Sequence, residues 1–266
     1  MTARIGGPLL SLSLLLGLAG CTSFYEIPFE TPIQAKLDVS AFQRVLIAGF
    51  ISGGTDDVDA NLETVRLLRS QLRTKSNLRV IDADVLPLTE IVADETKAAE
   101  IGTNGSTAEK TEKEKQESAL PGQIKNEKDL EPYERVFANA DFWKRIGEEY
   151  QNPLIVTGTV LFTPHSRSGF VQREQEVYDS FGRRRVVPVR AYMERKGFVL
   201  QQTFVFIDGR NGTTIHSESF REERLYNQSD NTPALSSYFE LMDEVLPKFL
   251  STLSTQKIRG SRALIK

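Results

Sequence analysis

Residues 45–50 read VLIAGF, a continuous apolar run that is soon followed by Gly53 and Gly54. A run of this length is typical of a strand that is buried on both faces of a sheet. The next apolar residues recur at spacings of four and three, as on one face of an amphipathic helix: Val58, Leu62, Val65, Leu68 and Leu72. Residues 78–82 read LRVID and predict a second strand. Strand, helix and strand in this order predict two parallel strands joined by a crossover helix.

The second half of the chain adds longer strands and two more helices. Helical spacing recurs in Val136, Ala140, Trp143, Ile146 and Tyr150. A long buried strand is predicted at 153–162, a hairpin at 170–189 with its tip at 179–182, and further strands at 197–207 and 213–220. Residues 232–253 predict a C-terminal helix, which Pro247 is expected to kink or break. The predicted fold class is therefore α/β (α+β), a mixed β-sheet flanked by helices, with a long β-hairpin section.

The ends of the chain and one internal segment differ from this pattern. Residues 94–131 hold ten acidic and six basic residues and no aromatic residue. Such a segment buries too little apolar surface to offset the entropy of ordering, so a mobile charged insertion is predicted there. Residues 21–43 are expected to form an extended anchor arm, and residues 256–266 an exposed basic tail. A single domain is thus predicted at 44–255.

The N-terminus has the pattern of an export signal over residues 1–20. Arg4 precedes an apolar run at 9–18, which is too short to span about 30 Å of hydrocarbon as a helix. Residues 18–21, Leu18-Ala19-Gly20-Cys21, resemble the lipobox of bacterial lipoproteins. The resemblance implies cleavage before Cys21 and fatty acylation (palmitate) at Cys21, which holds the chain on a membrane, facing the periplasm. Because members with Asp at the next position stay at the inner membrane, Thr22 favours the outer membrane; a plain secretory signal is the alternative.

The order of core and turn residues resembles a known group of envelope lipoproteins. Residues 80–82 (VID), 154–160 (LIVTGTV) and 205–212 (VFIDGRNG) are similar to the CsgG-like/LpoB-like group and to the N-terminal domain of TolB. This resemblance implies a protein that works through contacts with other envelope proteins. Members either form rings that secrete curli subunits through membrane-inserted hairpins, or dock an enzyme outside the membrane. Here charges such as Arg173, Glu174 and Arg190 fall on both alternation classes of the hairpin, which disfavours insertion into lipid, so a ring-forming secretion-channel subunit is the alternative function.

The sequence contains no recognisable catalytic, metal-binding or cofactor motif. It has one Cys and two His, with no HExxH and no GxSxG, and a slight net charge of −3 that disfavours nucleic acid as a partner. Gly53-Gly54 lacks the Gly-Lys-Ser/Thr of a phosphate loop, and Asp56 and Asp57 would repel a phosphate, so a turn with helix-capping acids is expected. No enzyme and no cofactor are therefore predicted.

The hairpin section is the candidate partner-binding surface. Eight basic and four acidic residues lie between Arg167 and Lys196, against an acidic background. Arg183, Arg184 and Arg185 beside Phe181, together with Arg190, would bind an acidic protein, a lipid headgroup or a glycan by charge-assisted hydrogen bonds. The alternative is a hairpin that its charges merely keep soluble. Whether the chain forms a homo-oligomer is left open.

Overall fold

The structure is a computed structural model, and it describes residues 24–94, 124–227, 230 and 232–265. The chain forms two compact units, one of residues 36–254 and one of the residues before and after it. Cys21, the export signal and most of the charged insertion, residues 95–123, lie outside the described residues.

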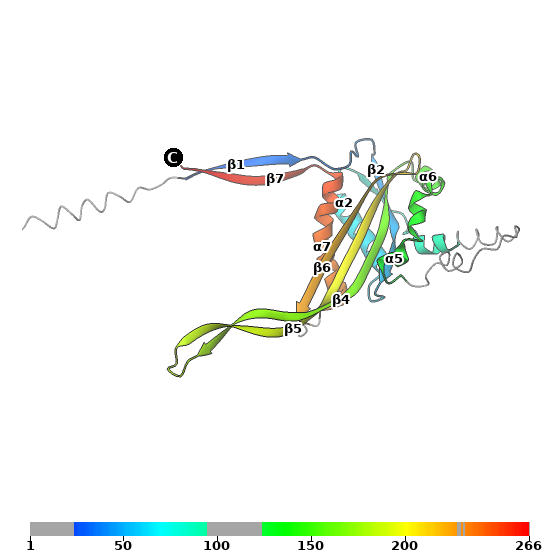
Figure 1. Ribbon diagram of the computed structural model, residues 1–266. Helices are drawn as coiled ribbons and strands as arrows, with labels where there is room; N and C mark the ends of the chain where they lie inside the picture. Colours follow the sequence, from blue (N-terminus) through cyan, green and yellow to red (C-terminus); the bar gives the residue numbers. More distant parts are fainter. Residues whose placement is uncertain (1–23, 95–123, 228–229, 231, 266) are drawn as a thin grey trace, which may run out of the picture. The chain divides into compact units, whose positions relative to one another are not determined.

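The unit of residues 36–254 is built on one five-stranded mixed sheet in the order β3-β2-β4-β5-β6 (Figure 1). Its strands are β2 (Arg44–Gly54), β3 (Arg79–Ile81), β4 (Leu154–Tyr178), β5 (Arg184–Asp208) and β6 (Thr213–Asn227). β2 is parallel to β3 and β4, whereas β4, β5 and β6 run antiparallel to one another. The predicted α/β fold and the parallel pair around the first helix are confirmed.

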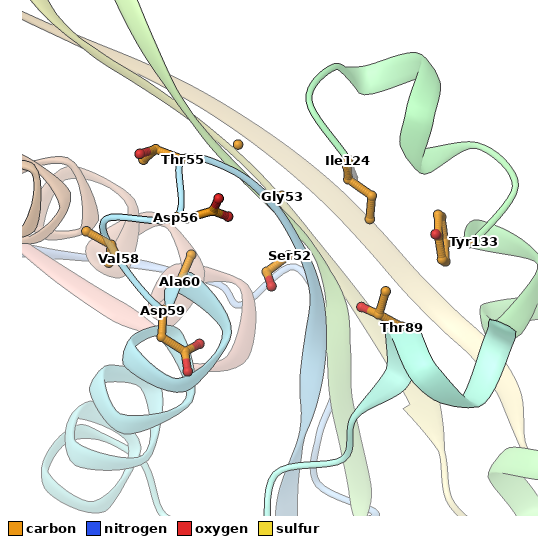
Figure 2. Close-up of a pocket in the computed structure, with 11 residues that line it drawn as sticks. Ser52, Gly53, Thr55, Asp56, Val58, Asp59, Ala60, Thr89, Ile124 and Tyr133 are labelled. Carbon is orange, nitrogen blue, oxygen red and sulfur yellow. The ribbon is translucent and has the colours of Figure 1, made fainter. Parts of the chain in front are cut away.

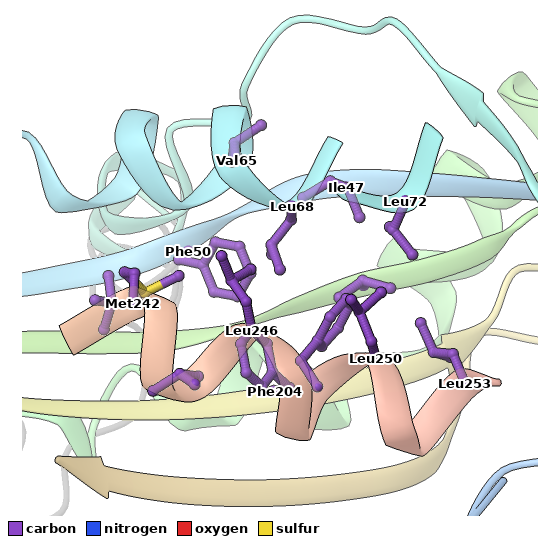
Figure 3. Packing of buried hydrophobic residues seen from close by; sticks show 14 of the residues in the cluster. Ile47, Phe50, Val65, Leu68, Leu72, Phe204, Met242, Leu246, Leu250 and Leu253 are labelled. Carbon is purple, nitrogen blue, oxygen red and sulfur yellow. The ribbon is translucent and has the colours of Figure 1, made fainter. Parts of the chain in front are cut away.

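Helices cover both faces of this sheet because β2 and β4 present apolar side chains alternately to each side. On one face α2 (Ala60–Lys75) and α7 (Ala234–Leu253) pack in one apolar cluster with Ile47 and Phe50 (Figure 3). On the other face Leu46 and Ile51 share a cluster with η2 (Glu134–Ala138) and α6 (Ala140–Glu149). The run at 45–50 is thus buried on both sides, as its composition predicts.

Three local predictions differ from the structure. The helix expected over 136–150 is divided, because the side chain of Asn139 accepts a hydrogen bond from the Phe142 N–H at 3.1 Å and caps α6. α7 continues without a break through Pro247. The end of the insertion predicted at about 94–131 is part of the folded unit, because Ile124 and Leu130 are buried and residues Glu127–Leu130 form the short helix α5.

The second unit is a two-stranded antiparallel ribbon. β1 (Phe24–Ile33) pairs along its whole length with β7 (Gln256–Ile265). An extended arm at 21–43 and an exposed tail at 256–266 were predicted, but not that β1 and β7 pair with each other. Hydrogen bonds between segments so distant in sequence leave no local pattern in either segment.

Candidate docking surface

β4 and β5 form a hairpin that continues well beyond the rest of the sheet (Figure 1). Their register is unbroken from Leu154↔Asp208 to Tyr178↔Arg184. β6 pairs with β5 only from Asp208 as far as Arg195. Residues 168–194, here called the distal hairpin, therefore pair only with each other among the residues that the structure describes.

The tip of the distal hairpin is held by Asp179. Its Oδ1 accepts hydrogen bonds from the backbone N–H groups of Phe181 and Arg183, both at 2.9 Å, and its Oδ2 accepts one from Nε of Arg183 at 2.9 Å. The backbone hydrogen bond from Arg183 is the main cause that holds the pKa of Asp179 below its ordinary value. The Arg183 guanidinium also lies 5.4 Å from the ring centroid of Phe181. Arg183 and Phe181 thus act together in shaping the tip.

One face of the distal hairpin carries charges of both signs. Glu174, Glu176 and Glu194 share it with Arg184 and Arg190, because residues paired across the two strands point to the same side. Arg184 forms an ion pair with Glu176. An edge-to-face pair of Phe170 and Tyr192, with centroids 5.4 Å apart and side chains 76% and 62% exposed, completes this face.

The opposite face is apolar and carries arginine as its only charged residue. It is here called the valine face, and its members are Val171, Arg173, Gln175, Val177, Arg185, Val187, Val189, Ala191 and Met193. Its apolar members are half-buried, whereas Arg173, Gln175 and Arg185 are exposed. Neither arginine forms an ion pair with a described residue, and the face has no carboxylate. The distal hairpin is therefore amphipathic, with an unpaired cationic and aliphatic side.

The arginines predicted as one partner-binding cluster are divided by this register. Arg184 and Arg190 lie on the charged face, Arg185 lies on the valine face, and Arg183 is bonded within the tip. Sequence reasoning expected charges on both faces, which is correct, but it missed that every carboxylate of the two strands lies on one of them. The signal was present in the turn at 179–182, because pairing residues outward from that tip would have assigned each side chain to its face.

A hollow of about 360 Å³ lies where β2 ends and α2 begins, lined by Ser52, Gly53, Thr55, Asp56 and Asp59 among others (Figure 2). The backbone N–H groups that a phosphate would need already have acceptors, since Gly54 N donates to Ile124 O at 2.8 Å and Thr55 N to Phe162 O at 2.9 Å. The helix N-terminus is capped by Asp59, whose carboxylate accepts from Leu62 N at 3.0 Å. A helix-capping acid is thus confirmed, but it is Asp59, and the geometry disfavours an anion there.

The two histidines lie near different carboxylates. Nε2 of His165 lies 3.6 Å from Glu223, and Nε2 of His216 lies 3.6 Å from Glu218. In the part of the chain that the structure describes, no three His, Cys, Asp or Glu side chains are grouped so that they could hold a metal ion. Within that part, every helix is too short or too polar to cross a membrane.

No family profile matches the sequence, and no curated protein is significantly similar to it. Among solved structures, the chain is similar to lipoprotein GNA1162 from Neisseria meningitidis, with a TM-score of 0.34 and 12% identity over 80% of this chain and 99% of that one. It is also similar to a protein described as a neuraminyllactose-binding hemagglutinin homolog from Helicobacter pylori, with a TM-score of 0.33 and 12% identity over 84% of this chain and 90% of that one. At these TM-scores neither likeness carries an argument about the function of this chain.

Proposed function

We propose that this chain is a non-catalytic lipoprotein of the bacterial cell envelope, anchored through Cys21, that docks an acidic envelope protein on its distal hairpin. The observation that carries the docking proposal is the valine face. An aliphatic row that includes Arg173 and Arg185, with no carboxylate beside them, is complementary to a protein surface that combines apolar and acidic side chains.

The chemistry of the valine face favours a protein over a glycan as the partner. The row of valine, alanine and methionine side chains gains most from an apolar counterpart, which a polar glycan lacks. The guanidinium group of Arg185 at the tip end of the row, and that of Arg173 in its middle, would form charge-assisted, bidentate hydrogen bonds with carboxylates. Arg183 and Phe181 at the tip would then lie beside the contact, whereas Arg184 and Arg190 lie on the other face.

Site-specific photocrosslinking in intact cells tests the docking proposal. A photoreactive benzoylphenylalanine in place of Val187 is expected to capture a discrete protein partner. The matched control places benzoylphenylalanine at Glu174, which lies on the charged face and is one residue pair farther from the tip than Val187. Equal capture from both positions, or capture from neither, would contradict the assignment of the valine face.

Charge reversal separates the two faces in the same assay. The double variant Arg173→Glu and Arg185→Glu is expected to lower the crosslink yield from Val187 by about tenfold or more, because it replaces attraction by repulsion at two contacts. Arg190→Glu, on the charged face, is expected to leave the yield within about twofold. A stronger effect of Arg190→Glu would move the docking surface to the opposite side of the hairpin.

Lipid attachment is tested independently by growth with a radiolabelled fatty acid. The wild-type chain is expected to carry label, and Cys21→Ala to carry none and to remain as an uncleaved precursor. Label on the Cys21→Ala chain would refute the lipobox assignment.

The alternative is a ring-forming secretion-channel subunit of the curli-secretion type. Light scattering of the detergent-purified protein separates the two functions. A stable high-order ring with single-channel conductance in a planar bilayer would overturn the docking proposal, whereas a monomer or small oligomer without conductance supports it.

A further inference from the structure

The ribbon of β1 and β7 has one apolar face that the described residues leave exposed. Alternate residues of β1 put Tyr25, Ile27, Phe29 and Ile33 on this side, and Ile258 of β7 joins them because it pairs with Thr31. These five side chains, here called the apolar ribbon face, are 44% to 72% exposed.

The other side of the ribbon carries four charged residues, Glu26, Glu30, Lys257 and Arg259, together with Pro28, Pro32 and Ala263. Glu30 accepts a hydrogen bond from Nε of Arg259 at 2.9 Å and lies 3.6 Å from Nζ of Lys257. Glu26 and Ser261 lie on the same side. The ribbon is therefore amphipathic, with ion pairs on the side opposite the apolar ribbon face.

Phe29 extends the apolar ribbon face over the neighbouring strand. It pairs with Gly260, where an added Cβ would lie only 2.7 Å from Cζ of the Phe29 ring. The end of the ring thus lies over the glycine and widens the apolar surface across both strands. A two-stranded ribbon has no core of its own, so it is stabilised mainly by burying the apolar ribbon face against another surface.

We propose that the apolar ribbon face lies on the lipid leaflet and forms a second membrane attachment beside the lipid on Cys21. The choice of the leaflet as the occupant rests on the proposed lipidation. Only residues 22–24 separate Cys21 from Tyr25, so a fully extended chain holds Tyr25 within about 14 Å of the acylated residue. The leaflet that holds the anchor is therefore within reach of the Tyr25 end of the apolar ribbon face.

The side chains of the ribbon suit the boundary between headgroups and acyl chains. Tyr25 is an aromatic residue of the kind that gathers at this boundary, and Phe29 is typical of the apolar face of a segment that lies on a membrane. Arg262 pairs with Ile27 and so lies on the apolar side, where its guanidinium can bind a headgroup phosphate. Interfacial binding of this kind adds to a lipid anchor without a membrane-spanning segment.

Fluorescence quenching tests the contact directly. The protein used begins at residue 22, so it has no acyl group, and it carries the substitution Phe29→Trp. It is mixed with vesicles of phosphatidylethanolamine and phosphatidylglycerol, to which brominated phosphatidylcholine is added as the quencher. The native Trp143 is fully buried in the other unit and serves as an unquenched background. Phe29→Trp is expected to add emission that brominated lipid quenches about twofold or more.

Ser261→Trp is the matched control, because Ser261 pairs with Pro28 on the polar side of the same ribbon. Its added emission is expected to resist quenching. In flotation assays with the same vesicles, Phe29→Asp is expected to lower the partition coefficient by about tenfold or more, and Ser261→Asp by less than about threefold.

Equal quenching at both positions, or none at Phe29→Trp, would overturn the proposal. A concentration-dependent dimer that protects Phe29→Trp from iodide without vesicles would also overturn it, by making a second copy the occupant. Fatty-acid labelling of the wild-type chain distinguishes the two proposals. Label at Cys21 with no quenching defeats the ribbon contact alone, and quenching with no label defeats the anchor alone.

Discussion

Replacing Tyr238 by phenylalanine is expected to lower the free energy of unfolding of the 36–254 unit by about 1 to 1.5 kcal/mol. Tyr238 lies on α7 and is fully buried. Its hydroxyl lies 2.5 Å from Oγ1 of Thr64 and 3.1 Å from the carbonyl oxygen of Ala60, and its one proton is shared between these two acceptors because Thr64 itself donates to Ala60. These contacts join α7 to the first turns of α2, so the variant probes the pairing of two helices on one face of the sheet.

The contacts around Tyr238 place the expected loss of unfolding free energy at the low end of the range for the removal of a buried polar group. The phenylalanine ring keeps the edge-to-face contact with Phe162, whose centroid is 5.2 Å away, so no large cavity forms. The Ala60 carbonyl also keeps a partner, because Oγ1 of Thr64 donates to it at 2.6 Å. What is lost is close to the net value of one hydrogen bond, far less than the roughly 3 to 5 kcal/mol of a truncation to alanine.

Urea unfolding followed by the fluorescence of the single tryptophan, Trp143, measures this change. The midpoint is expected to fall while the slope of free energy against urea stays the same. Thr64→Val and the double variant complete a cycle, in which a coupling of about 0.5 kcal/mol or more is expected. A Tyr238→Phe chain as stable as wild type, or two additive substitutions, would refute the assigned bond.

The pH dependence gives a second readout of the same residue. Burial, the largest cause, raises the pKa of Tyr238 above its ordinary value. The phenol of the unfolded chain ionises near pH 10, whereas the folded state keeps it neutral, so its contribution to stability is complete below pH 10 and falls as the pH rises further. The advantage of wild type over Tyr238→Phe is therefore expected to shrink above about pH 10.

Two further substitutions test the turn between β5 and β6. The side-chain hydrogen bond from Arg210, opposed by partial burial, holds the pKa of Asp208 below its ordinary value. Asp208→Asn is therefore expected to lower the free energy of unfolding by about 1 kcal/mol in urea at pH 7. Below the folded pKa of Asp208 the variant is expected to match wild type, because a carboxyl group with a lowered pKa stabilises the fold only while it is ionised. Equal losses at both pH values would contradict this ion pair. Gly147→Ala is expected to lower the melting temperature through a loss of about 1 to 3 kcal/mol, since its Cβ would lie 1.8 Å from the Gly209 carbonyl oxygen, whereas Gly169→Ala, with nothing within 4 Å, is expected to be neutral. A neutral Gly147→Ala would show that α6 does not pack closely on this turn.

The accuracy of the sequence predictions depended on how local the deciding contacts are. The buried strand at 45–50 and the stripe of Val65, Leu68 and Leu72 on α2 were predictable, because burial on a sheet or helix repeats within a few residues. The division of the helix at Asn139 was missed although its signal is local, since periodicity alone does not register a capping side chain.

The candidate docking surface was predicted only in part. The sequence identified the hairpin and its arginines, but it treated Arg183, Arg184 and Arg185 as one group. Adjacent strand residues point to opposite faces, so the register at the tip divides them. That register also collects the valines of both strands on one side, which neither strand reveals when it is considered alone.

The sequence by itself determined the α/β class, the hairpin and the motif at residues 18–21, because each is written in neighbouring residues. Only the tertiary structure decided that β1 pairs with β7 and that their apolar side chains form one exposed face. The physical reason is the range of the interaction. Backbone hydrogen bonds between the two ends of a chain have no sequence code of their own, so the partner of each strand is known only when the whole chain has folded.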